Sequence, residues 1–287
     1  MLQGVEAGDP RALHRMRVAS RRLREVLPIL QLDAEVTGKV NRRLRKVTSR
    51  LGVVRELDVM LALIDELSAV GRYSRPALAR VSASLSERRV RARARMLKKV
   101  PGRELRRVAA KLDKLLQTLS TKEASVTPRG RAMTARSWQW VLEARVARRA
   151  SGLAEAIDQA GAMYLSERLH VVRIAVKKLR YALELSADVA GQKTTPELTQ
   201  LRRAQEVLGR LHDLQVLIDR TRETQASLTP PDLAAWRELD RLVVSLDEDC
   251  RRLHGRYMHD SPSLEAICVR LGASRTQPSR LKLKTRN

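Results

Sequence analysis

The amino-acid sequence predicts an all-α protein. Apolar residues recur at intervals of three and four along nearly all of the 287 residues, and strict alternation never lasts long enough to indicate a strand. Capping side chains stand before prolines at several positions, which is typical of helix starts because proline is tolerated in the first helical turn. With 43% apolar residues, the chain can bury a sizeable core.

These start and stop signals place the helices in order along the chain. Starts are expected at Asp9-Pro10, Ser74 before Pro76, Thr195-Pro196-Glu197 and Ser261-Pro262. Breaks are expected at Pro101-Gly102, Ala190-Gly191 and Pro230-Pro231, with a polar linker over 120–130. The expected helices are 10–32, 36–69, 75–99, 103–119, 131–160, 163–187, 197–222, 232–257 and 262–271.

The charge balance points to an acidic partner. Lys and Arg number 57 against 32 Asp and Glu, which gives a net charge of +25, and 45 of the 57 are Arg. Guanidinium groups favour forked contacts to phosphate oxygens, although a GC-rich genome would also inflate the share of Arg. The chain has no Phe, three Trp and four Tyr, which disfavours a protein that stacks single-stranded bases on rings.

Cysteine usage and hydropathy indicate the compartment. The two thiols, Cys250 and Cys268, have the spacing of neither a zinc site nor a disulfide framework, which fits a reducing environment. The N-terminal residues lack a signal-peptide pattern, and no stretch approaches a membrane span. A cytoplasmic protein that does not enter a membrane is therefore expected.

Two stretches of the chain resemble each other. HRMRVASRRLR begins at His14 and HVVRIAVKKLR begins at His170, an offset of 156 residues. A second match follows at an offset of 157, where Leu51-Gly52 parallels Leu208-Gly209. Two matches in the same order predict duplication of a helical unit. The expected domains are 1–125, with a charge of +16, and 126–272, followed by a basic, disordered tail over 273–287.

Each repeated stretch carries a row of cations on one helical face. The spacings of three, four and three place the members of each row in one narrow stripe. The first row is His14, Arg17, Arg21 and Arg24, and the second row is His170, Arg173, Lys177 and Arg180. Like charges at this spacing repel mildly, so a bound anion would explain both rows better than a solvated face, which remains the alternative. The following helices add Lys39, Arg42, Arg45, Lys46 and Arg50 in the first half, and Arg202, Arg203 and Arg210 in the second.

With these motifs, the chain resembles the conserved histidine α-helical domain family, abbreviated CHAD, over residues 9–270. The resemblance implies two pseudo-symmetric four-helix bundles that face each other across a basic cleft or pore. It further implies binding of inorganic polyphosphate there, and attachment to polyphosphate granules as in the proteins called phosins; phosphate or sulfate ions would fit the same site. The polyphosphate contacts that it implies are His14, Arg17, Arg21, Arg22, Arg24, His170, Arg173, Lys177, Lys178 and Arg180.

The sequence departs from this family in its first bundle. Family members have a helix ahead of the first histidine motif, equivalent to 131–160, whereas only residues 1–13 precede His14. Either the start is truncated or the first bundle is incomplete. No triphosphate-hydrolase domain, kinase or Walker loop is recognisable, so no catalytic residues, no metal ligands and no cofactor are expected, and the protein is not expected to be an enzyme.

Two other functions remain open on the sequence alone. Non-specific binding of RNA or DNA backbones is the main alternative, because any surface of this charge attracts nucleic acid. A histidine-based metal or phosphohydrolase site is less favoured, since the cations beside His14 and His170 repel a metal ion and no acidic cluster is adjacent. Whether these two histidines contact ligand or orient a neighbouring helix is also open.

Overall fold

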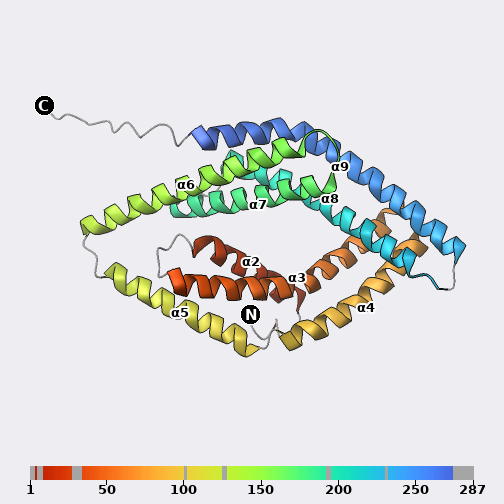
Figure 1. Cartoon of the computed structure of the whole chain (residues 1–287), viewed down its shortest axis with the longest axis horizontal. Helices are drawn as coiled ribbons and strands as arrows, with labels where there is room; N and C mark the ends of the chain where they lie inside the picture. The colour runs from red at the N-terminus through yellow and green to blue at the C-terminus, as the bar shows by residue number, and fades with distance from the viewer. Residues whose placement is uncertain are drawn as a thin grey trace. The chain divides into compact units, whose positions relative to one another are not determined.

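The computed structural model is helical over the residues that it describes, which are Gly4 and 9–27, 34–99, 102–124, 128–191, 195–229 and 232–273. No strand occurs in these ranges, so the predicted all-α class is confirmed. None of the helices described there is both long enough and apolar enough to cross a bilayer. The helices drawn in Figure 1 are α2 (Pro10–Val26), α3 (Ala34–Val70), α4 (Arg75–Lys99), α5 (Gly102–Ala124), α6 (Pro128–Ala160), α7 (Ser166–Val189), α8 (Pro196–Ala226) and α9 (Leu233–Ala273).

Side-chain caps begin the helices where the sequence predicts them. The Asp9 carboxylate accepts hydrogen bonds from the backbone N–H groups of Arg11 and Ala12, at 3.0 and 3.1 Å. Ser74 caps α4 and Thr195 caps α8 in the same manner, each through its hydroxyl oxygen at 3.3 Å from a backbone nitrogen. These caps satisfy amide groups that have no partner within the helix.

The helix start predicted at Ser261-Pro262 is wrong. Pro262 lies inside α9, which continues to Ala273. A proline in a helix interior costs about 3 kcal/mol relative to alanine. Packing offsets that cost, because Ser261 is buried before the proline, and Leu264 and Ile267 lie fully buried after it. Continuous burial across the proline therefore overrides the local stop signal.

Three other expected boundaries shift. α5 runs to Ala124 rather than ending at 119, and α6 begins at Pro128, so most of the expected linker over 120–130 is helical. α7 begins at Ser166 rather than at 163. The rest of that linker, 125–127, lies outside the described residues, as do 28–32 of the first expected helix and 274–287 of the expected tail.

The chain forms two compact units, and each combines segments that are distant in sequence. Unit 1 consists of Met1–Arg131 and Asp213–Cys250, and unit 2 of Ala132–His212 and Arg251–Asn287. α8 and α9 therefore each contribute to both units. The expected domains 1–125 and 126–272 are halves of a sequence repeat, and that repeat stays a prediction.

Unit 2 has one core to which four helices contribute. α6, α7, the first part of α8 and the last part of α9 all supply buried residues to it. From α7 these are Leu169, Val172, Val176, Leu179 and Ala182. The apolar face expected for the second repeated helix is thus buried, which leaves the opposite face of α7 for its cations.

Unit 1 combines buried apolar side chains with ion pairs. α2 packs against α3, where Ala12 and Met16 meet Val47, Leu51 and Val54. α3, α4 and the segments of α8 and α9 in this unit all contain fully buried apolar residues, among them Met60, Leu78, Leu217 and Leu246. Polar side chains also connect these segments. The ion pairs are Glu56 with Arg220 at 3.2 Å, Arg88 with Glu223, and Arg72 with Asp249, whose carboxylate also accepts from the Tyr73 hydroxyl group; Arg72 and Tyr73 lie between α3 and α4.

Candidate functional site

The first row lies on α2 where this helix packs on α3. His14 and Arg22 are exposed, and Arg17, Arg21 and Arg24 are partly buried. Arg17 Nη1 donates a hydrogen bond to the backbone oxygen of Thr48 on α3, at 3.0 Å. The row is therefore partly held by the neighbouring helix rather than extended freely into solvent.

A glycine on α3 makes room for this contact. A Cβ atom built on Gly52 would lie 2.8 Å from Arg17 Nη1, closer than real Cβ contacts allow. Gly52 belongs to the Leu-Gly pair that the sequence repeats, and this close approach gives a physical reason for glycine there. The equivalent Gly209 in unit 2 has no atom within 4 Å of its hypothetical Cβ.

Cations surround His14 from two helices. Although His14 is exposed, partial desolvation of its ring lowers its pKa below the usual 6.5, and the positive charges of Arg55, Arg17 and Arg21 lower it further, in that order. Arg55 comes from α3 and was not among the expected contacts. The site around His14 is thus a field of positive charge that disfavours protonation of the imidazole.

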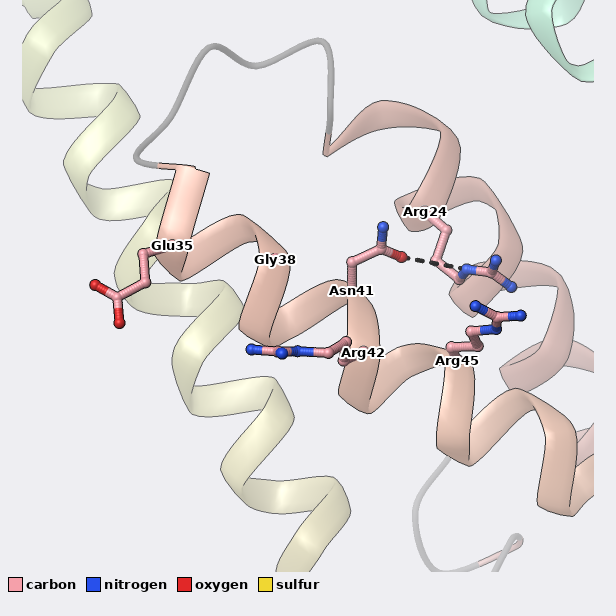
Figure 2. Close-up of a pocket in the computed structure, with 6 residues that line it drawn as sticks. All are labelled: Arg24, Glu35, Gly38, Asn41, Arg42 and Arg45. Atoms are coloured by element: carbon pink, nitrogen blue, oxygen red, sulfur yellow. Dashed lines mark hydrogen bonds between the residues drawn. The ribbon is translucent and has the colours of Figure 1, made fainter.

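The far end of the first row opens into a pocket between α2 and α3. Arg24 Nε donates to Asn41 Oδ1 at 3.3 Å. The pocket has a volume of about 450 Å³ and is lined by Arg24, Glu35, Gly38, Asn41, Arg42 and Arg45 (Figure 2). It brings one expected contact of the first row together with two expected contacts of the following helix.

The other cations expected on α3 differ in their surroundings. Lys39 forms an ion pair with Glu35, one helical turn before it. Lys46 is exposed, as are Arg42 and Arg45, and no acidic side chain of the described residues pairs with these three. Arg50 is half-buried and makes polar contacts of its own.

The second row, on α7, meets a histidine from α8. The Nδ1 atoms of His170 and His212 are 3.3 Å apart, and the ring centroids are 4.7 Å apart. Burial and the charges of Arg173, His170 and Lys177, in that order, together lower the pKa of His212 to about 4. The pKa of His170 is lowered by burial first, then by Arg173 and Lys177. Lys178, beside them, is exposed.

Arg180, the last member of the second row, lies beside an acidic side chain. Arg180 Nε donates to Gln205 Oε1 at 2.8 Å, and its guanidinium forms an ion pair with Glu184 and stacks over the Tyr181 ring. Arg202 approaches the same Glu184 carboxylate at 3.4 Å. This end of the second row is neutralised within unit 2. Of the remaining expected contacts on α8, Arg203 is exposed and Arg210 is half-buried.

Three residues that the fold brings to the rows were not among the expected contacts, and one acid was overlooked. Arg55 and His212 occupy equivalent positions at the offset of 157 residues, and each lies beside the histidine of its own repeat. That alignment was a usable signal. Glu184 follows Arg180 by four residues, the spacing at which opposite charges pair on a helix. Asn41 gave no signal, because its role depends on the packing of α2 against α3.

This arrangement suits a polyanion better than a metal ion. Divalent metals require neutral imidazoles combined with carboxylates or thiolates, and both histidine sites are surrounded by cations. Within the ranges that the structure describes, no group of three or more His, Cys, Asp or Glu residues is placed to hold a metal ion. Rows of guanidinium and ammonium groups supply many donors for phosphate oxygens.

Comparisons with known proteins concern the fold and the family. The fold is similar to that of PptA from Streptomyces chartreusis, with a TM-score of 0.59 and 17% sequence identity, over 91% of this chain and 93% of that chain. No curated protein matches the sequence. The family model of the CHAD domain matches residues 2–222. By that match, which covers most of its length, this chain belongs to the CHAD domain family.

Proposed function

We propose that this protein binds inorganic polyphosphate through its two rows of cations, without chemical conversion of the polymer. One observation carries the proposal: at both rows the charges that act on the histidine and lower its pKa come from several cations, with no acid among them. Concentrated positive charge of this kind destabilises the folded chain unless an anion cancels it. Membership of the CHAD family supports polyphosphate as that anion.

The proposed ligand contacts are the residues expected from the sequence, and their contributions depend on whether an acid pairs with them. Arg21, Arg22, Arg42, Arg45 and Lys46 have no acidic partner among the described residues and are expected to contribute most. Lys39 and Arg180, which pair with Glu35 and Glu184, are expected to contribute less.

The physics of binding is that of a charged polymer. Each interior phosphate carries about one negative charge, and each guanidinium that contacts one releases condensed counterions, as on nucleic-acid backbones. Affinity should therefore fall steeply with salt. A thin chain without bases would fit between helices that a duplex cannot enter, which gives selectivity without aromatic side chains.

The proposal also covers how the two repeats share the polymer and where the protein lies in the cell. The two repeats are proposed to share one basic cleft, so that one long polymer engages both rows and the stoichiometry is one polymer per protein. In the cell, the protein is proposed to lie on polyphosphate granules in the cytoplasm. A fluorescent fusion that stays diffuse in cells with visible granules would contradict the cellular part alone.

A competition titration tests the central claim. Fluorescently labelled long-chain polyphosphate is titrated at two salt concentrations, with RNA and double-stranded DNA as competitors at equal phosphate concentration. The test variant combines Arg21→Gln and Lys177→Gln, which removes one charge from each row. The control combines Arg95→Gln and Arg256→Gln, two exposed cations outside the rows, one in each unit.

The row variant is expected to bind more weakly and to have a salt dependence reduced by about one ion for each lost contact. The control variant has the same net charge as the row variant. Its affinity for polyphosphate should stay close to that of the unchanged protein. Equal weakening of the two variants would show that only overall charge matters, as in the alternative of non-specific nucleic-acid binding. Equally strong competition by RNA or duplex DNA would have the same meaning.

A further inference from the structure

We propose that the pocket between α2 and α3 is a subsite for the terminal phosphate group of a polyphosphate chain, clamped by Arg24 and Arg45 and positioned by Asn41. This inference rests on the proposed function, and it assigns one end of the polymer to this pocket. Arg24 and Arg45 come from different helices and line the same pocket. Figure 2 shows their guanidinium groups turned toward the same end of it, while Arg42 extends the other way.

The charges at this pocket are not balanced by acids. No acidic side chain of the described residues pairs with Arg24, Arg42 or Arg45. Glu35 also lines the pocket, but it forms an ion pair with Lys39, and Figure 2 shows its carboxylate directed away from Arg24 and Arg45. Two guanidinium groups held at one end of a pocket repel each other, and an oxyanion between them would remove that repulsion.

Asn41 fixes the geometry of the clamp. Its Oδ1 atom accepts from Arg24 Nε, which restrains the guanidinium plane and leaves the two terminal nitrogens of Arg24 to donate. Asn41 is therefore a positioning residue that acts through Arg24.

The equivalent end of the second row is built differently. Arg180 also donates its Nε to an amide oxygen, that of Gln205. There, however, Glu184 supplies the opposing charge that an anion would supply at Arg24. A phosphate group would have to displace this carboxylate, so no such subsite is expected at Arg180. The comparison provides a matched control within the same molecule.

The ligand class follows from charge and from size. A terminal phosphate carries a second negative charge that titrates near pH 6, whereas an interior phosphate carries only one. Forked guanidinium donors match the exposed oxygens of such an end group. The pocket volume of about 450 Å³ admits a short run of phosphate units but no large folded ligand.

Linear and cyclic triphosphates test the assignment. Tripolyphosphate has two terminal groups, and trimetaphosphate has the same number of phosphorus atoms but none. Binding of each to the full chain is measured by calorimetry, for the unchanged protein and for Asn41→Ala, Arg45→Gln, Gln205→Ala and Arg95→Gln. Long-chain polyphosphate is measured in parallel, and circular dichroism verifies that each variant is folded.

The unchanged protein is expected to bind tripolyphosphate about tenfold or more tightly than trimetaphosphate, because each bidentate charged contact contributes over 1 kcal/mol. Asn41→Ala and Arg45→Gln should remove most of this preference, while Gln205→Ala and Arg95→Gln should retain it. A merely structural role of Asn41 would leave the preference unchanged.

Equal affinity for the two triphosphates, or an undiminished preference in Asn41→Ala, would overturn the inference. If long-chain polyphosphate still binds tightly in that case, the proposed function stands and only the end-group subsite fails. If long-chain polyphosphate does not bind at all, the proposed function itself is wrong.

Discussion

The histidine pair in unit 2 should couple protonation to stability. Burial and the nearby cations lower the pKa of His212 from 6.5 to about 4 in the folded chain. The unfolded chain therefore takes up a proton at His212 more readily than the folded chain does. The contribution to stability is complete above pH 6.5, falls as the pH drops from 6.5 toward 4, and levels off below that.

The magnitude follows from the two pKa values. A fall from 6.5 to about 4 corresponds to about 3 kcal/mol of lost stability once the pH is below both values. At pH 5 the same values give about 2 kcal/mol. Because part of the His212 ring is open to solvent, screening reduces this to about 1 kcal/mol.

Two measurements check this prediction against the variant His212→Gln, which keeps a polar side chain without a titrating ring. In histidine-labelled protein, the NMR signal absent from the variant identifies His212 among the five histidines, and it should titrate near pH 4. In urea unfolding, the unchanged protein should lose about 1 kcal/mol more stability than the variant between pH 8 and pH 5. Titration of His212 near 6.5, or equal losses in both proteins, would refute the reasoning.

The same pair should respond to the ligand. A bound polyanion cancels the field of Arg173 and Lys177, so the pKa of His170 and of His212 should rise on binding. Binding then takes up protons, and affinity for polyphosphate should increase as the pH falls from 8 to 6. Calorimetry in buffers of different ionisation enthalpy measures this uptake. Uptake that is unchanged in His212→Gln would contradict this role of the pair.

Four further outcomes concern two glycines, one core leucine and one buried thiol. Gly52→Ala should displace the Arg17 guanidinium and weaken polyphosphate binding severalfold with little change in stability, whereas Gly209→Ala, with open space around it, should stabilise the protein by about 0.5 to 1 kcal/mol in urea unfolding. Leu179→Ala, at a fully buried position, should cost about 2 to 5 kcal/mol in the same assay. Cys268, whose pKa is raised to about 11 by burial, should react with iodoacetamide at pH 8 only as fast as the chain opens, which mass spectrometry can follow.

Much of the fold could be read from local signals. Asp9, Ser74 and Thr195 begin helices as expected, because a cap depends on only three or four neighbouring residues. The start at Pro262 was wrong, since burial on both sides of the proline is a tertiary property. The grouping of α8 and α9 with both units was equally out of reach, because no local pattern records which distant helix a segment packs against.

The sequence by itself determined where the cationic rows lie. Spacings of three and four residues place side chains on one face of any helix, whatever the helix packs against. Pairs four residues apart on one helix, such as Arg180 with Glu184 and Lys39 with Glu35, also follow from that spacing. Only the tertiary structure decided which groups of a neighbouring helix act on the rows. The partners that set each local field, Asn41 and Arg55 in unit 1 and Gln205 and His212 in unit 2, come from a neighbouring helix. Electrostatic interactions act through space, so their balance at a site depends on how helices pack.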